Sequence, residues 1–501
     1  MSASSIAPCP ADVGLSRRDA RIQKTDRASI VAGAVSAEAR RWFALAIGSL
    51  VIAGLLSVSI VIGRLPGISR LIDDPLFFKR CLVVHVDLAL VVWFYAFLAG
   101  LNAMRAGRPG GAVGAAAFCV SVAGVGAMLG GALIRGAQPV LANYVPVIDH
   151  PLFLGGLAAF FTGTLVFLLE TLGSRRNSRD LAPKQGGLPL DGAAGLQAAA
   201  VAFLLAAATW IATRASLPSG LDPWTKYEFS AWGAGHVLQV ANASAMLAVW
   251  LWLLVRVTGR PVLSASGGRI VFTLLIAPHF AMPLLTARGA MDSLYHTGAT
   301  QLMRWGIFPV VLAVFALGLR HLRRHGVANG DPLARVALAG FASSAGLTLL
   351  GFLLGACIRS SSTLVPAHYH ASLGGVTVSF MAGAYLICAA VRPGTPGVPP
   401  VFRTGAVGKP AIPGRSARWQ LVIFGIGQAV FALGFAMGGI HGLGRKMYAG
   451  EQHVRTTGEL VGLAVMGVGG LVATVAGVWF LVLILRAMRG WWRRSAARAF
   501  D

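Results

Sequence analysis

The stretch PAHYHASLGG, residues 366–375, places two histidines, His368 and His370, at the head of a long apolar run. An ionisable side chain inside such a run is costly and marks a candidate functional site. On a helix with 3.6 residues per turn, two residues that are two apart point about 200° away from each other. The two imidazoles therefore cannot bind one ion, but they can bind two different groups on opposite flanks of the helix.

The whole chain is as apolar as this stretch. Its 501 residues are 56% hydrophobic and 12% charged, which is typical of a protein that crosses the membrane many times. A membrane helix needs about 20 apolar residues, and polar backbone facing lipid must be paired within a helix. We therefore predict an all-α bundle of twelve membrane helices: 42–63, 80–104, 112–135, 151–174, 193–213, 232–257, 269–287, 301–320, 336–357, 366–391, 419–440 and 460–485.

The positive charge sets the predicted orientation. The formal net charge is +25, and most of the 43 Lys and Arg residues fall on the side that carries both termini. Because basic residues stay on the cytoplasmic side, we expect cytoplasmic tails at 1–41 and 486–501 around a membrane domain at 42–485. A bacterial-type inner membrane is the expected location. Anionic lipid headgroups explain the charge, so nucleic acid is not an expected partner.

Five histidines are predicted to share one depth. Counted from the span ends at 1.5 Å per residue, all of them lie roughly 8–12 Å below the outer surface. They are His85, His236, His279, His368 and His370. A single histidine in a membrane is often a hydrogen-bonded packing residue, but five in one layer favour neutral imidazoles that act as metal ligands.

Two haems on either side of the 366–391 helix would account for its two histidines. Iron accepts axial imidazole, and the porphyrin is apolar enough for the core of a bundle. One haem would need a second axial ligand, for which His85 is available. The other haem would keep an open face toward His236 and His279.

Several segments resemble one protein family. HYHASLGGVTVSFMAGAYLI (368–387), YVPVIDHPLFLGG (144–156), WGAGHVLQV (232–240) and GLGRKMY (442–448) are similar to segments of subunit I of the haem–copper oxidases, a twelve-helix protein. The closest likeness is to the B-type cytochrome c oxidases. The similarity spans most of residues 80–460, and its specific motif is the helix with two histidines.

The resemblance implies a role for each matching residue. It assigns His85 and His370 to a six-coordinate low-spin haem, and His368 to the high-spin haem that binds the gaseous substrate. It makes His236 and His279 two of the three ligands of a second metal, copper or iron. Arg445 and Lys446 match the basic pair that holds haem propionates, and without this resemblance they would be ordinary loop residues.

Three departures from the family pattern bear on the chemistry. Phe280 stands where the family has a further histidine, and His296 could replace that ligand only if its loop folds inward; otherwise it is a surface residue. The usual Pro after His236 is Val237, and the usual Tyr is Val240. That Tyr supplies an electron and a proton when O2 is reduced, whereas the coupling of two NO molecules does not need one.

The missing Tyr therefore favours a related nitric oxide reductase over an oxidase. In either case Gln239 is a candidate catalytic residue that could donate a hydrogen bond to a bound oxygen atom. Its other interpretation is a polar contact between helices, worth about 0.6 kcal/mol. Asp87 could belong to a proton path or support His85 as a neighbour.

The electron donor must be another protein. The sequence has no C-x-x-C-H haem attachment motif and no cluster of Cys and His for a dinuclear copper centre. We expect a cupredoxin-type subunit or a cytochrome c on the outer side. The two alternatives are a haem sensor or carrier with a decayed copper site and a transporter whose histidines relay protons. Transporters tend to have helices interrupted by Gly or Pro, and the 232–257 and 366–391 spans lack an internal Pro.

Overall fold

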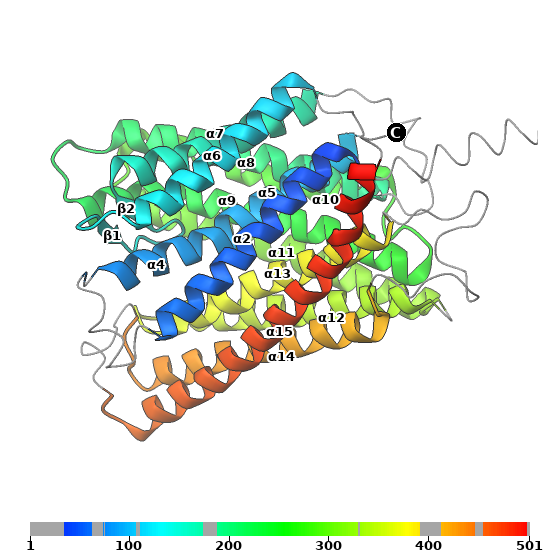
Figure 1. Ribbon diagram of the computed structural model, residues 1–501. Coiled ribbons are helices and arrows are strands. Elements are labelled where there is room, and N and C mark those ends of the chain that lie inside the picture. The colour runs from blue at the N-terminus through cyan, green and yellow to red at the C-terminus, as the bar shows by residue number, and fades with distance from the viewer. Residues whose placement is uncertain are drawn as a thin grey trace, which may run out of the picture.

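The twelve predicted spans are all present in the fold. The computed structural model describes residues 35–62, 74, 76–106, 111–173, 188–328, 331–390, 412–445 and 454–497. In this part of the chain, twelve helical spans are long and apolar enough to cross a membrane, and they form one bundle (Figure 1). Ten are continuous α-helices: α2 (Ala37–Ile62), α6 (Ala112–Ala132), α7 (Pro151–Gly173), α8 (Leu190–Ser216), α9 (Pro223–Thr258), α11 (Ser293–His325), α12 (Pro332–Ala356), α13 (Leu364–Ala390), α14 (Gly414–Ile440) and α15 (Thr457–Ala497).

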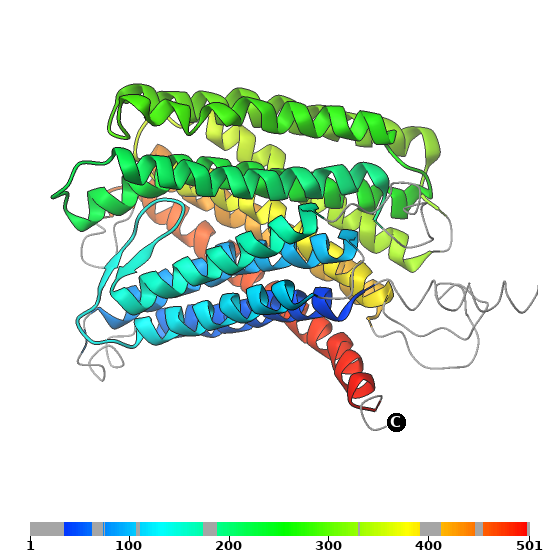
Figure 2. The same ribbon diagram turned by 90° about the horizontal axis from the view of Figure 1, so that it is seen from above.

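The other two spans, the second and the seventh, depart from a simple α-helix. The second span consists of α4 (Phe77–Val86), a π-helical turn η1 (Asp87–Val92) and α5 (Trp93–Ala106). The seventh begins as α10 (Ala265–Ile276) and tightens into the 3₁₀ segments η3 (Ala277–Ala281) and η4 (Leu284–Arg288). The last span, α15, is a single long helix whose final turns project beyond the bundle (Figure 2).

Two helices form the centre of the bundle. In α9, 94% of the most apolar window is buried, and in α13 the value is 83%, whereas it is 28% in the peripheral α11. A short polar chain ties the centre together: the Trp250 indole donates to the Ser344 hydroxyl (2.7 Å), which donates to the carbonyl of Gly375 (2.6 Å). These bonds join α9, α12 and α13, the helices that carry His236 and the two histidines of the PAHYH segment.

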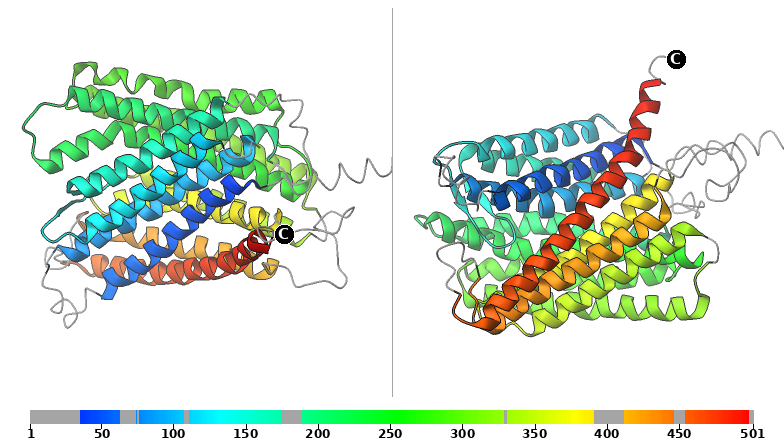
Figure 3. Two further views of the ribbon diagram at one scale, coloured as in Figure 1. Left: turned by 45° about the horizontal axis from the view of Figure 1, so that its top comes forward. Right: turned by 60° about the horizontal axis from the view of Figure 1, so that its bottom comes forward.

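Glycines allow neighbouring helices to approach closely. Helices α14 and α15 run side by side (Figure 3), and a Cβ atom at Gly469 would lie 2.7 Å from the Cα atom of Phe431. Small residues of this kind are usual at the interfaces of membrane helices, where close van der Waals packing drives association.

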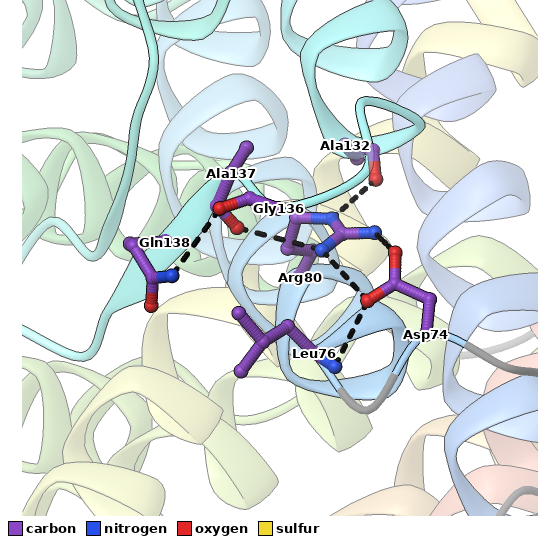
Figure 4. A network of polar contacts seen from close by, with 7 residues as sticks. All are labelled: Asp74, Leu76, Arg80, Ala132, Gly136, Ala137 and Gln138. Carbon is purple, nitrogen blue, oxygen red and sulfur yellow. Dashed lines mark hydrogen bonds and ion pairs between the residues drawn. The ribbon is translucent and has the colours of Figure 1, made fainter.

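A small hairpin covers one end of the bundle. Strands β1 (Gln138–Val140) and β2 (Val147–Asp149) pair antiparallel, with Pro139 opposite Ile148. The fully buried Arg80 of α4 anchors the hairpin (Figure 4). Its guanidinium donates to the carbonyls of Ala132 (2.8 Å) and Ala137 (3.4 Å) and forms a 2.5 Å ion pair with Asp74. The Arg80 hydrogen bond lowers the pKa of the Asp74 carboxyl, so this pair stays charged at neutral pH.

The chain enters and leaves the bundle at the same end. Helix α2 begins and α15 ends opposite the β1–β2 hairpin (Figure 1), as an even number of crossings requires. Most of the predicted tail at 1–41 and of the connector at 392–418 lies outside the described residues, whereas α15 continues through residues 486–497 of the other predicted tail.

Candidate functional site: histidines at the outer end of the bundle

The two histidines of α13 contact different neighbouring helices. His368 pairs its Nδ1 atom with the carbonyl of Gly351 on α12 at 2.7 Å. The His370 ring instead contacts α14, where it lies 4.8 Å from the Phe431 ring and stacks on Phe435 at 5.4 Å. The imidazoles therefore point to different flanks of α13, as their spacing predicts.

His85 comes from the second span to meet His370. Its Nδ1 atom lies 2.8 Å from the carbonyl of Ala53 on α2, and the ring is close enough to His370 for the charges of the two imidazoles to interact. Two residues later, Asp87 is fully buried, and neither of its carboxylate oxygens has a hydrogen-bond partner. Residues 285 positions apart along the chain thus lie near each other in the fold.

His236 and His279 lie in a second group with aromatic neighbours. His236 is close enough to His279 and His296 for their charges to interact. The Nδ1 atom of His279 lies 3.0 Å from the carbonyl of Leu275, while its buried Nε2 atom has no partner. Pro278 lacks an N–H group and precedes His279 at the start of η3, where the helix narrows.

His296 faces inward and is not the surface residue that its position suggests. It lies in the first turn of α11, and its ring packs 5.0 Å from those of Phe229 and Trp232. Its Nε2 atom is buried and without a partner. The sequence offers only a weak signal for this, since residue 296 precedes the apolar run of its span.

Most of these histidines share one hydrogen-bonding pattern. In His85, His236, His279 and His368, the Nδ1 atom lies against a backbone carbonyl. An imidazole held in this way has a defined tautomer and orientation and presents Nε2, which is the usual arrangement of metal-binding histidines. Glycines make room beside two of the rings: a Cβ atom at Gly355 would lie 2.7 Å from Nδ1 of His368, and one at Gly306 would lie 2.5 Å from His279.

The first group of residues fits two haems. His85 and His370 lie near each other on separate spans, His368 turns to another flank of α13, and the aromatic rings of Phe431 and Phe435 lie against His370. Axial imidazoles in apolar surroundings are what haem iron requires.

The second group does not fit a metal with three protein ligands. Among the described residues, no three His, Cys, Asp or Glu side chains are placed to hold one ion. Phe280 is 51% exposed, so its side chain lies on the surface of the bundle. The Nε2 atom of His236 is already bonded to the hydroxyl of Tyr144 at 3.1 Å.

The remaining predicted site residues have other partners. Arg445 donates to the side-chain oxygen of Asn143, and Lys446 lies outside the described residues. Gln239 accepts a 3.3 Å hydrogen bond from Asn242 on its own helix, and Val240 is fully buried. Tyr144, which sequence reasoning missed as a site residue, reaches His236 from the loop between β1 and β2.

The family of the chain follows from comparison with known proteins. The family described as "Cytochrome C and Quinol oxidase polypeptide I" matches residues 38–489. The chain belongs to this family. A heme-copper terminal oxidase dimer solved by cryo-electron microscopy has the same fold, with a TM-score of 0.65 and 15% identity over 92% of this chain and 84% of the other.

Two curated relatives of this chain are uncharacterised proteins. One, from Aquifex aeolicus, is 29% identical over 69% of this chain and 83% of its own length. The other, from Rickettsia prowazekii, is 20% identical over 90% of this chain and 96% of its own length. The predicted family and the twelve-helix fold are therefore confirmed, and an oxidoreductase is the class of enzyme that the family implies.

Proposed function

We propose that this chain is the catalytic subunit of a membrane-bound respiratory reductase that reduces a diatomic gas, O2 or NO. His85 and His370 would hold a low-spin haem, and His368 would hold the high-spin haem at which the gas binds. When bound, the two haems would supply electron transfer and the binding and reduction of the gas. The observation that carries this proposal is the divergence of the two α13 imidazoles, with His85 brought to His370 from another span.

The chain's own residues would orient these groups. The carbonyls of Ala53 and Gly351 hold the Nδ1 atoms of His85 and His368, so that each Nε2 atom can face iron. Arg445 is a candidate for pairing with a haem propionate, because an arginine–carboxylate pair is a strong charge-assisted contact. Electrons would come from a cytochrome c or a cupredoxin-type subunit on the outer side.

The choice of gas depends on two features that point in different directions. Val240 removes the tyrosine that O2 reduction uses in the family, which favours NO. Tyr144, however, places a phenol against His236 from another element, so the site does not lack a tyrosine. Gln239 would need to leave Asn242 to donate a hydrogen bond to a bound oxygen atom.

A specific observation favours one alternative function. Because the described residues include no group of three metal ligands, the chain could hold its haems without reducing gas, as a sensor or haem carrier. This alternative predicts bound haem without turnover of O2 or NO.

A spectrum and a turnover assay separate the two functions. The reduced-minus-oxidised spectrum of the purified protein should show two haems, one of which binds CO. The protein should then consume O2 or NO when supplied with a reduced c-type cytochrome. Two haems without turnover of either gas would support the alternative, and absence of haem would refute both functions. Metal analysis of the same sample would show whether copper or non-haem iron accompanies the haems.

A further inference from the structure

We propose that Tyr144 is the positioning residue of His236: its phenol, supplied by the β1–β2 loop, holds the imidazole in one tautomer and one orientation. The contact itself is present in the fold, and only the expected effect on turnover rests on the proposed function.

The backbone at Tyr144 is strained in a way that serves this contact. Tyr144 has a φ of 67° and is the one non-glycine residue with positive φ in the described part of the chain. A left-handed backbone conformation is unfavourable for a residue with a Cβ atom and persists only where the surrounding structure enforces it. The loop therefore adopts an unfavourable backbone conformation at Tyr144, the residue whose hydroxyl contacts His236.

A glycine on α9 makes room for the ring. Gly235 directly precedes His236, and a Cβ atom at position 235 would lie 2.5 Å from the Cβ atom of Tyr144. Any larger side chain would push Tyr144 away from the helix. The rings of Tyr144 and His236 lie 4.9 Å apart, and both pack against Trp232.

Polar contacts hold the loop from both sides. The backbone N–H of Asn143 donates to the Glu228 carboxylate at 2.7 Å, the Asn143 amide donates to the same carboxylate, and Arg445 donates to the amide oxygen. On the other side, Arg80 holds the carbonyl of Ala137 just before β1 (Figure 4). The contacts of Asn143 and Arg80 thus hold the loop in position. The Tyr144 hydroxyl is not needed for this and is available to bond His236.

The direction of the hydrogen bond follows from the partners of both rings. Nδ1 of His236 lies 2.8 Å from the carbonyl of Trp232, and since a carbonyl can only accept, this nitrogen carries the proton. Nε2 must then accept from the Tyr144 hydroxyl. A phenol has an ordinary pKa of about 10, so the Tyr144 hydroxyl keeps its proton at neutral pH and can donate it in the hydrogen bond to Nε2.

This arrangement gives His236 a role unlike that of the other histidines. His279 and His296 present Nε2 atoms without partners, whereas the Nε2 lone pair of His236 is occupied by a phenol. A metal ion could bind Nε2 only by displacing Tyr144. The absence of a three-ligand metal group among the described residues agrees with this competition.

The test measures the hydrogen bond at His236 directly. The purified, CO-bound reduced protein is labelled with ¹⁵N in its histidine rings and studied by solid-state NMR as the wild type, Y144F and Y227F. The His236 signal is assigned by its loss in H236Q. We expect Y144F to shift the Nε2 resonance toward that of an unbonded nitrogen and to lower turnover about 10- to 100-fold, with unchanged haem content.

The control is matched in chemistry and location. Tyr227 lies on the same side of the bundle and donates to Asp149 at 2.6 Å, so Y227F loses a phenol without altering His236. The proposal is wrong if Y144F leaves the Nε2 resonance in place, or if Y227F moves it equally. If Y144F does not accumulate, 3,5-difluorotyrosine at position 144, a stronger donor, should shift the resonance in the opposite direction, and no shift would overturn the proposal.

The two readouts keep this proposal separate from the proposed function. If the wild type turns over neither O2 nor NO, the proposed function fails, while the NMR comparison still decides whether Tyr144 positions His236.

Discussion

At the scale of single residues, hydrogen bonds from Nδ1 to backbone carbonyls fix the orientation of four of the site histidines. A buried imidazole without partners loses its solvation, and pairing one nitrogen with a backbone carbonyl offsets part of that cost. The carbonyls of Ala53 and Gly351 do this for His85 and His368 on two different helices. The second nitrogen of each ring then remains available at a defined position.

The two α13 histidines should be separable by substitution. H370N should remove the low-spin haem and its sharp absorption in the reduced spectrum, because His370 and His85 form one pair. H368N should keep that absorption and lose CO binding, because His368 faces α12. Haem content by pyridine haemochrome and the CO difference spectrum measure both effects.

A histidine away from these helices provides the control. His325 is exposed at the opposite end of the bundle, at the end of α11, so H325N should change neither spectrum. If H368N and H370N remove the same haem, the assignment of separate flanks is refuted.

The spacing and the predicted membrane depth of the histidines indicate which of them lie at the same end of the bundle. They do not predict which loop residues contact them. The two-residue spacing in PAHYH sets opposite flanks for His368 and His370 on any helix. The contact of Tyr144 depends on one left-handed backbone angle and on the space beside Gly235. The inward position of His296 depends on where α11 begins, and span boundaries are the least certain part of a sequence-based prediction.

At the scale of helices, the packing of α15 against α14 supports the His370 site. Gly469 faces the backbone of Phe431, whose ring lies 4.8 Å from that of His370. G469A should force the two helices apart and destabilise the protein by about 1–3 kcal/mol. It should also shift the low-spin haem spectrum, because Phe431 would move.

A second glycine on the same helix is the matched control. Gly467 lies two residues before Gly469, and a Cβ atom there would meet no atom within 4 Å. G467A should leave the thermal midpoint and the haem spectrum close to those of the wild type. Equal effects of G467A and G469A would show that helix propensity, and not the α14–α15 contact, governs both.

Helix interiors were predictable, while their irregular turns were not. The apolar run at 269–287 predicts one span, and the structure divides it into α10, η3 and η4. Pro278 and Pro283 lack the N–H groups that an α-helix uses, which explains the tightening, but proline alone does not distinguish a kink from a 3₁₀ turn. The π-turn after His85 leaves no comparable signal in the sequence.

At the scale of the whole molecule, the site histidines lie at the end of the bundle opposite the start of α2 and the end of α15. The β1–β2 hairpin, Tyr144 and Arg445 lie at one end, whereas α2 begins and α15 ends at the other (Figure 1). The number of spans was predictable because each span must cover the same thickness of hydrocarbon. The orientation in the membrane is a separate prediction, which rests on the distribution of Lys and Arg.

Cysteine labelling at the two ends tests that orientation. Gln138 is exposed in the hairpin and Arg323 is exposed at the end of α11, so Q138C and R323C place equivalent thiols on opposite sides. If basic residues mark the cytoplasm, an impermeant maleimide should label Q138C in intact spheroplasts and R323C only after permeabilisation. The wild type gives the background from the native cysteines. The reverse pattern would place the histidines near the cytoplasmic surface, and the electron donor would then have to be a cytoplasmic protein.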